Sequence, residues 1–187
     1  MARSGPRLHS DHLVGARHSS DTHIDRSTPA PFRVPDAPPS PPAPWPFHRT
    51  IPVIYHDIDA LNHLNHAAYF RFMETLRCEY YLPLLGHNDP TKLDIIVAEA
   101  ACRYLAPVVY GQELLGEVAP SRSLGRTSFT LLYRFRSTRT DDPTVYARGR
   151  TVLVSFDYSK GQKKEIPAPL RRLLERDGVD PASEGWG

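Results

Sequence analysis

Eleven consecutive residues, from His56 to His66, contain two carboxylates, three imidazoles and two side-chain amides. They stand directly before a segment with helical periodicity. The start of a helix leaves backbone N–H groups without partners and carries a partial positive charge, which suits a developing oxyanion. A carboxylate beside such a position can act as a nucleophile or as a base for water. The turn is therefore a candidate catalytic site.

Two other interpretations of this turn stay open on residue types alone. Asp and Asn are preferred helix N-caps, so capping explains some of these side chains without any chemistry. A metal site is the other interpretation, because carboxylates and imidazoles are common ligands. The segment lacks the two histidines four residues apart that a helical zinc motif carries, and this argues against metal. Capping and metal-free catalysis are about equally supported at this point.

The turn leads into a predicted helix whose apolar residues recur at three- and four-residue steps. These residues are Tyr69, Phe72, Met73, Leu76, Tyr80 and Leu84. Polar residues occupy the opposite side, and Leu85-Gly86 is the expected stop. Because the apolar face is broad, we expect other structure to wrap around this helix.

Strand-like runs surround the predicted helix. One short run, 50–55, precedes the turn, and its Pro52 places it near an edge or a strand start. After the helix, β-type patterns cover residues 95–105, 112–118, 126–135 and 145–158, and Pro167 opens a last short helix over 168–176. No crossover helices separate the later strands, which excludes a doubly wound parallel sheet. The sequence therefore predicts an α+β fold in which one antiparallel sheet curls round one long helix.

The chain divides into three parts by composition. Residues 1–48 are polar and rich in proline, and we expect them to form a disordered leader. Residues 49–176 form the predicted folded domain, and residues 177–187 are expected to be a disordered, frayed tail. With 40% apolar and 24% charged residues in 187, the composition is that of an ordinary soluble globular protein.

Charge and cysteine content exclude several classes of function. The formal net charge is +2 and Lys and Arg do not cluster, so nucleic acid is not an expected partner. No apolar stretch is long enough to span a membrane, and no secretory signal follows the N-terminal arginines. Cys78 and Cys102 form no C-x-x-C pair and are expected to be reduced thiols. A cytoplasmic location is the resulting expectation.

The segment from Tyr55 to Arg77 resembles the signature of the 4-hydroxybenzoyl-CoA thioesterase-like family, which runs D-x-D-x-x-G-H-x-N-N-x-x-Y and continues with E-x-x-R. The matching residues here are Asp57, Asp59, His63, Asn65, Tyr69, Glu74 and Arg77. Further similar segments follow in the same order, namely Tyr104–Pro107, Tyr110-Gly111, Leu124–Ser128 and Ile166-Pro167. The resemblance covers about residues 50 to 175.

This resemblance implies a hotdog fold that pairs into a homodimer or homotetramer, with active sites between subunits. It implies an acyl-CoA substrate and requires no cofactor or metal. Asp59 then corresponds to the catalytic carboxylate, and the backbone N–H of His66 to the group that polarises the thioester carbonyl. Asp57 is expected to be structural. His63 is either a general base or, as more often in this family, part of the hydrogen-bond scaffold of the turn.

The sequence departs from the signature at two positions. Asn62 replaces the family's glycine, and Asn is one of the few residues that tolerate positive φ. His66 replaces the second asparagine. Glu74 has a rival claim to catalysis because another hotdog branch uses a helix carboxylate, but its spacing to Arg77 favours a structural ion pair.

Substrate contacts are also implied by the resemblance. Arg126, with Ser128 in the same motif, matches a position that meets the nucleotide end of CoA, and Lys163-Lys164 is a weaker phosphate candidate. Tyr69, followed by Phe72 and Met73, suggests an aromatic or medium-length acyl group, although core packing explains these side chains equally well. The expected activity is thioester hydrolysis. A hydroxyacyl-thioester dehydratase and a non-catalytic acyl-CoA-binding protein are the two alternatives.

Overall fold

The computed structural model describes residues 45–86, 89 and 92–186, so most of the predicted leader lies outside the described residues. The strands are β1 (Phe47–Pro52), β2 (Ile95–Tyr104), β3 (Glu113–Leu124), β4 (Ser128–Ser137), β5 (Val145–Asp157) and β6 (Gln162–Lys163). The helices are α1 (His66–Leu84) and α2 (Ala168–Asp177), with short 3-10 turns η1 (Tyr55–Asp57) and η3 (Ala182–Glu184). None of the helices in this described part is long and apolar enough to cross a membrane.

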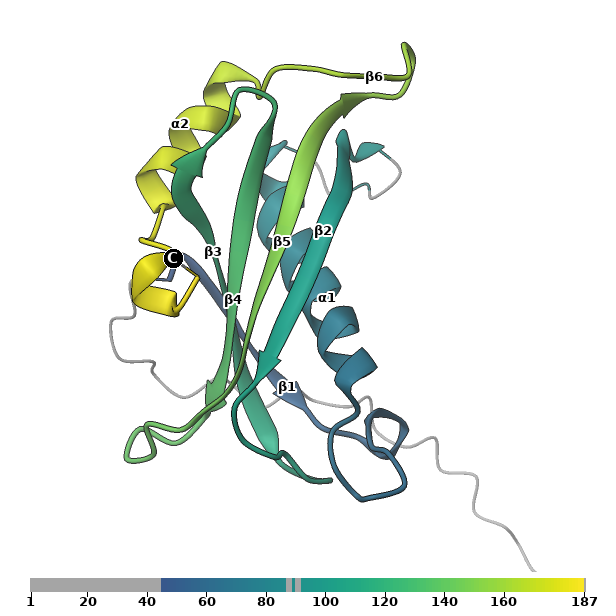
Figure 1. Ribbon diagram of the computed structural model, residues 1–187, viewed down its shortest axis with the longest axis vertical. Helices are drawn as coiled ribbons and strands as arrows, with labels where there is room; N and C mark the ends of the chain where they lie inside the picture. The colour runs from purple at the N-terminus through teal and green to yellow at the C-terminus, as the bar shows by residue number, and fades with distance from the viewer. Residues whose placement is uncertain (1–44, 87–88, 90–91, 187) are drawn as a thin grey trace, which may run out of the picture. The chain divides into compact units, whose positions relative to one another are not determined.

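The strands form one antiparallel sheet in the order β1-β3-β4-β5-β2, and β6 pairs with the end of β5. Figure 1 shows α1 lying behind this sheet, whereas α2 lies beside β3. The predicted α+β arrangement, with an antiparallel sheet around one long helix, is therefore confirmed. The edge strands are β1 and β2.

The core lies between α1 and the inner face of the sheet. On α1, the three- and four-residue spacing buries Met73, Leu76 and Tyr80. On β4, the two-residue alternation turns Phe129, Leu131, Tyr133 and Phe135 inward, where all four are buried. The helix approaches closely at Gly149, where an added Cβ would stand 2.2 Å from Met73 Sδ. A side chain there would therefore force the Met73 side chain to move.

Strand β3 is longer than the sequence predicts. It continues to Leu124 instead of ending near Val118, although it contains Pro120. The carbonyl of Pro120 faces Val179 and not β4, so the missing N–H of this proline lies on the side where β1 has already ended. Pro120 therefore removes no hydrogen bond from the β3–β4 ladder, and the strand can continue.

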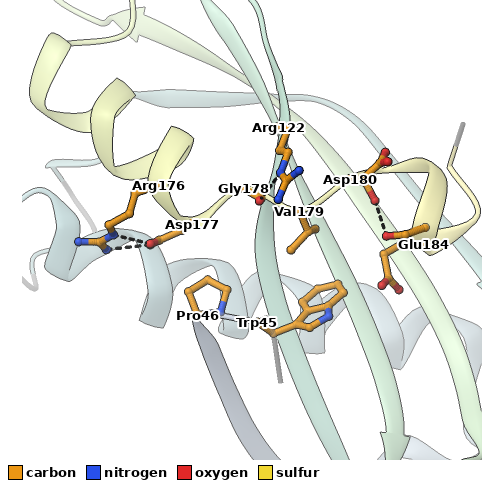
Figure 2. Close-up of a pocket in the computed structure, with 10 residues that line it drawn as sticks. Trp45, Pro46, Arg122, Arg176, Asp177, Gly178, Val179, Asp180 and Glu184 are labelled. Carbon is orange, nitrogen blue, oxygen red and sulfur yellow. Dashed lines mark hydrogen bonds and ion pairs between the residues drawn. The ribbon is translucent and has the colours of Figure 1, made fainter. Parts of the chain in front are cut away.

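The C-terminal segment differs from the predicted frayed tail. Beyond α2, Val179 runs parallel to β3 and exchanges two backbone hydrogen bonds of 2.9 Å, with Pro120 and Arg122. Val179 and Trp186 then pack with Trp45 over Ala119 and Leu132 on the outer face of the sheet. Figure 2 shows the cleft, about 550 Å³ in volume, between this segment and Trp45-Pro46. The tail is held by partners that lie far away in the sequence, which a local pattern does not reveal.

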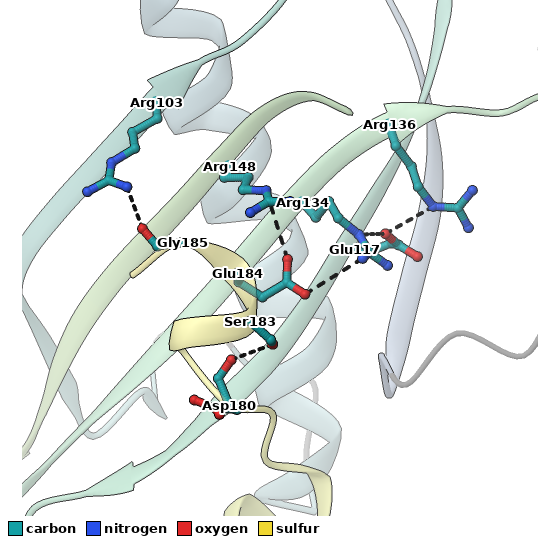
Figure 3. Close-up of polar contacts among 9 residues, drawn as sticks. All are labelled: Arg103, Glu117, Arg134, Arg136, Arg148, Asp180, Ser183, Glu184 and Gly185. Carbon is teal, nitrogen blue, oxygen red and sulfur yellow. Dashed lines mark hydrogen bonds and ion pairs between the residues drawn. The ribbon is translucent and has the colours of Figure 1, made fainter. Parts of the chain in front are cut away.

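Charged contacts also hold the tail (Figure 3). Glu117 is fully buried and accepts hydrogen bonds from Arg134 at 2.6 Å and Arg136 at 3.1 Å. Glu184, in η3, lies 3.7 Å from Arg134 and 4.0 Å from Arg148. Further along the tail, Arg103 donates to the carbonyl of Gly185. Arginines of strands β2, β4 and β5 therefore hold the tail against the outer face of the sheet.

The N-terminal boundary of the domain also differs from the prediction. Trp45 is buried, its ring stacks under the Arg134 guanidinium at 4.9 Å, and β1 begins at Phe47. The folded domain therefore includes residues from 45 onward, which the sequence placed in the leader. A tryptophan between prolines resembles leader composition, and its burial depends on the distant tail.

Candidate functional site

The turn before α1 is closed by its own backbone. Asp59 donates its N–H to the carbonyl of His63 at 2.8 Å, and Asn62 donates to the carbonyl of Asp59 at 3.1 Å. Asn62 adopts φ 60°, the left-handed conformation in which the family carries glycine. The expectation that Asn62 can hold this turn is confirmed. The turn is anchored to the loop after β2, because Leu64 donates its N–H to Val108 at 2.7 Å.

The Asp59 carboxylate is oriented by this turn. Its Oδ1 accepts the N–H groups of Leu61 at 2.8 Å and His63 at 3.2 Å. Its Oδ2 receives no hydrogen bond from any other residue that the structure describes. One oxygen therefore fixes the side chain and the other is available to a ligand.

Asp57 has the opposite environment. It is 5% exposed, its Oδ1 accepts a hydrogen bond of 2.6 Å from Arg71, and its Oδ2 accepts the N–H of Ile54 at 3.1 Å. Its backbone carbonyl accepts the N–H of Asn65 at 2.8 Å. Asp57 therefore ties the strand before the turn to the second turn of α1. This is the structural role that the family resemblance implied.

Helix α1 begins at His66, with Asn65 as its N-cap. Asn65 Oδ1 accepts the N–H of Ala67 at 2.9 Å, and the Asn65 carbonyl accepts the N–H of Ala68 at 2.9 Å. Neither acceptor serves the N–H of His66, which belongs to the first turn, where helices lack internal partners. A 19-residue helix also places a partial positive charge at this end. The N–H of His66 is therefore a suitable donor to an anionic oxygen.

A cavity of about 410 Å³ joins the turn, the helix start and the end of β2. Its lining residues are Asp59, His63, Leu64, His66, Tyr69, Tyr104, Leu105, Ala106, Pro107 and Val108. The structure thus brings four of the sequence-predicted site residues together, namely Asp59, His63, His66 and Tyr69. Sequence reasoning missed Tyr104 and the loop that follows it. The available signal is the Tyr-x-x-Pro segment at 104–107, which resembles the family at this position.

Tyr69 lies at the buried side of the cavity and is 3% exposed. Burial, followed by the nearby Cys102, Tyr104 and Tyr146, raises the pKa of its hydroxyl well above the usual range. Its ring stands 5.3 Å from that of Tyr104 and 5.3 Å from that of Phe135. Tyr69 is therefore a neutral, firmly packed wall at neutral pH.

Arg126 and Ser128 do not join this cavity within one chain. They lie at the β3–β4 hairpin, where Thr127 accepts a hydrogen bond from Ser155, the residue that pairs with Ile95 at the start of β2. The cavity lies at the other end of β2, and a ten-residue strand spans roughly 30 Å. Figure 1 shows the hairpin and the turn before α1 at opposite ends of the sheet. Arg126 is exposed and forms an ion pair of 2.8 Å with Glu165.

Two of the remaining charged candidates, Glu74 and Lys164, have structural partners. Glu74 and Arg77 form the expected ion pair on α1, at 3.3 Å, and Lys164 lies 2.8 Å from Asp94. Among the residues that the structure describes, no three His, Cys, Asp or Glu side chains gather as ligands for a metal ion. Neither Glu74 nor Lys164 lines the cavity.

Fold and site together define a hotdog protein in which a cavity joins a carboxylate to the N-terminus of the central helix. The chain belongs to the thioesterase-like superfamily, whose family profile matches residues 53–174. The family that the sequence suggested is therefore confirmed. Comparison with curated protein sequences gives no match.

Solved structures of thioesterases are similar to this chain. A thioesterase-superfamily protein from Jannaschia sp. CCS1 is 25% identical, with a TM-score of 0.65, over 74% of this chain and 88% of the other. A thioesterase from Thermus thermophilus, in complex with coenzyme A and zinc, is 25% identical, with a TM-score of 0.60, over 70% and 98%. A 1,4-dihydroxy-2-naphthoyl-CoA thioesterase from Synechocystis, at 17% identity and a TM-score of 0.58 over 68% and 94%, shares the fold.

Proposed function

We propose that the protein hydrolyses acyl-CoA thioesters to a carboxylic acid and free CoA, with Asp59 as the catalytic carboxylate. The observation that carries the proposal is the shared cavity of Asp59 and the N-terminus of α1. Thioester hydrolysis needs a nucleophile or base on one side of the carbonyl carbon and a donor to its oxygen on the other. The family and the thioesterase relatives support the same reaction class.

In this mechanism Oδ2 of Asp59 attacks the thioester carbonyl or removes a proton from the attacking water. Oδ1 stays bound to the N–H groups of Leu61 and His63, so the carboxylate keeps its orientation. An oriented group reacts faster because part of the entropy of positioning is lost before the reaction begins. In the first route a mixed anhydride forms on Asp59 as the C–S bond breaks, and water then hydrolyses this anhydride to the carboxylic acid. In the second route water adds to the carbonyl directly, and the proton taken up by Asp59 passes to the departing CoA thiolate.

The N–H of His66 receives the carbonyl oxygen as negative charge develops on it. Stabilisation of this kind is often the largest single contribution to catalysis, because the donor needs no reorganisation. His63 contributes its backbone to both sides of the Asp59 turn, through an accepting carbonyl and a donating N–H. We assign the His63 side chain to the wall of the cavity and the His63 backbone to the scaffold.

The nucleotide end of CoA is proposed to reach Arg126 on a second subunit. One edge of β2 has no strand partner among the described residues, and residues 96–100 of this strand are exposed on both faces. Antiparallel pairing of two β2 edges would bring the hairpin end of one subunit to the cavity end of the other. Arg126 and Ser128 would then lie near the cavity that they do not reach in their own chain.

A panel of acyl-CoAs with a thiol-reactive dye tests the proposed function. Hydrolysis releases one thiol per turnover. Hydration or dehydration of the acyl group without thiol release would instead indicate a dehydratase. Saturable binding of acyl-CoA without either reaction would indicate a binding protein. A reaction without substrate measures the background from Cys78 and Cys102, both of which have a pKa raised by burial. Absence of thiol release across the whole panel would contradict the proposal.

A further inference from the structure

Tyr104 bridges the two elements that enclose the proposed reaction centre. It is the last residue of β2, and its hydroxyl donates a long hydrogen bond of 3.4 Å to the backbone carbonyl of His66. Its ring therefore stands across the cavity, between the edge strand and the first turn of α1. The proposed oxyanion donor is the N–H of this same His66. The Tyr104 ring therefore lies next to the position proposed for the reacting carbonyl.

The wall behind Tyr104 is fixed. The Tyr69 ring lies 5.3 Å from the Tyr104 ring and is itself held between Phe135 at 5.3 Å and Phe72 at 6.4 Å. Tyr69 is buried, so it cannot move away without opening the core. Tyr104 is 48% exposed. Of the two rings, only Tyr104 can be removed without leaving a hole in the core.

The two arms of an acyl-CoA leave the carbonyl in different directions. The CoA arm is long and must reach solvent, so it needs the open side of the cavity, where His63 and His66 are exposed. The acyl arm is then left with the side of the cavity that Tyr69 and Tyr104 line. Apolar residues Leu64 and Val108 complete this side, and both are buried.

We infer that Tyr104 determines the size of the acyl group, and that the substrates are acyl-CoAs with compact acyl groups, short aliphatic or single-ring. This inference rests on the proposed function and adds the substrate class to it. A hydrophobic pocket discriminates acyl groups by about tenfold or more for each methylene that it cannot accommodate. Long chains are therefore excluded by the ring of Tyr104, and its hydroxyl is not required for this exclusion.

The test compares kcat/KM for a series of saturated acyl-CoAs, from short to long, and for a benzoyl-type CoA. The wild-type protein should prefer the short and single-ring substrates. Tyr104→Ala should raise the ratio of long-chain to short-chain kcat/KM by at least about tenfold. Tyr104→Phe keeps the ring and should keep the wild-type ranking. Tyr110→Ala is the matched control, because this exposed ring contacts Tyr55 and does not line the cavity.

Binding supplies a second measurement that does not depend on turnover. Non-hydrolysable thioether analogues of the same chain lengths should show the same ranking by calorimetry, for the wild-type protein and for Tyr104→Ala. An inert protein that still ranks the analogues in this way would refute hydrolysis and support the role of Tyr104. An unchanged ranking in a folded Tyr104→Ala protein, or a wild-type preference for long chains, would overturn the inference. Tyr104→Leu replaces the alanine variant if circular dichroism shows that the latter is unfolded.

Discussion

Two aspartates separated by a single residue have different environments in this turn. Asp57 is buried, and both of its carboxylate oxygens and its carbonyl are engaged by Arg71, Ile54 and Asn65. Asp59 faces the cavity with Oδ1 engaged and Oδ2 open to a ligand. Asp57 contacts Arg71 of α1, whereas Asp59 lines the cavity together with the loop after β2. Each residue therefore has its own measurable consequence.

Replacing Asp59 by Asn should abolish most of the activity without affecting the fold. The amide keeps the shape and the Oδ1 acceptor of the side chain but loses the anionic oxygen. We expect kcat to fall by about a hundredfold or more, the usual scale for loss of a catalytic acid or base. The melting temperature should stay close to that of the wild-type protein. A folded and fully active Asp59→Asn enzyme would overturn the mechanism and leave the fold assignment intact.

Replacing Asp57 by Asn should mainly reduce stability. The variant loses the charged partner of Arg71 at a buried position, and hydrogen bonds to charged groups typically contribute about 1.5–3 kcal/mol. Denaturant unfolding should therefore show a lower free energy of unfolding, whereas kcat falls much less than in Asp59→Asn. Arg71→Met should also lower the free energy of unfolding, because it removes the same ion pair. Arg71→Lys keeps the positive charge, so its loss of stability should be smaller. A kinetic defect as large as that of Asp59→Asn, with normal stability, would contradict a structural role.

At the scale of elements, the two ends of the described chain pack against each other on the outer face of the sheet. Val179 adds to β3 where β1 has ended, and Trp45 packs beside it over Leu132. Glu184 brings a carboxylate to the arginines of β4 and β5. The tail is therefore part of the folded domain, on the face of the sheet opposite to α1 and away from the cavity.

Removing residues 178–187 should destabilise the protein and leave kcat nearly unchanged. The deletion uncovers Trp45, Ala119 and Leu132, and loss of a large buried side chain such as Trp typically costs about 3–5 kcal/mol. Thermal unfolding measures the loss, and turnover of the folded fraction measures the activity. Glu184→Gln separates the charge contribution, since it keeps the apolar cover. A deletion with wild-type stability would show that the tail does not pack on the sheet in solution.

At the scale of the whole molecule, the outer edge of β2 pairs with no strand in the described part of the chain. Ile96 and Val97 are exposed along β2, and an exposed apolar edge strand favours pairing with another chain. The thioesterase relatives share this fold, and the proposed CoA contact requires the second subunit. Assembly and activity are therefore expected to depend on each other.

Activity should require a dimer formed through β2. Light scattering of the wild-type protein should give a dimer or a tetramer, and Val97→Arg should shift it toward monomer because like charges would face each other across the edge. Specific activity should fall together with the dimer fraction as the protein is diluted. A fully active monomer would exclude this arrangement, whereas a tetramer is compatible with it.

Arg126→Ala should raise KM for acyl-CoA and change kcat little. A phosphate contact far from the thioester binds the ground and transition states equally, so its loss weakens binding without slowing the chemical step. The salt dependence of KM should also become weaker. Glu165→Ala is the matched control, because it removes the ion-pair partner of Arg126 and should not raise KM. Identical kinetics at low salt would remove Arg126 from the substrate site.

Local sequence signals were sufficient for the central part of this protein. The apolar spacing of α1, the alternation of β4 and β5 and the absence of crossover helices predicted the antiparallel sheet around one helix. The family signature predicted that His66 begins the helix and that Asn62 replaces a glycine, and the left-handed conformation of Asn62 agrees with this. These features depend on residues that are close neighbours in the chain, so the sequence by itself determines them.

Only the tertiary structure decided which distant residues meet. It placed Tyr104 beside His66, joined Val179 and Trp45 on one face of the sheet, and separated Arg126 from the cavity by the length of β2. Periodicity shows that a residue is buried or exposed but not which partner covers it. The packing of the tail and of Trp45 differs from the sequence-based expectation for this reason. Such contacts follow from the order and register of the strands, which arise when the whole sheet closes around α1.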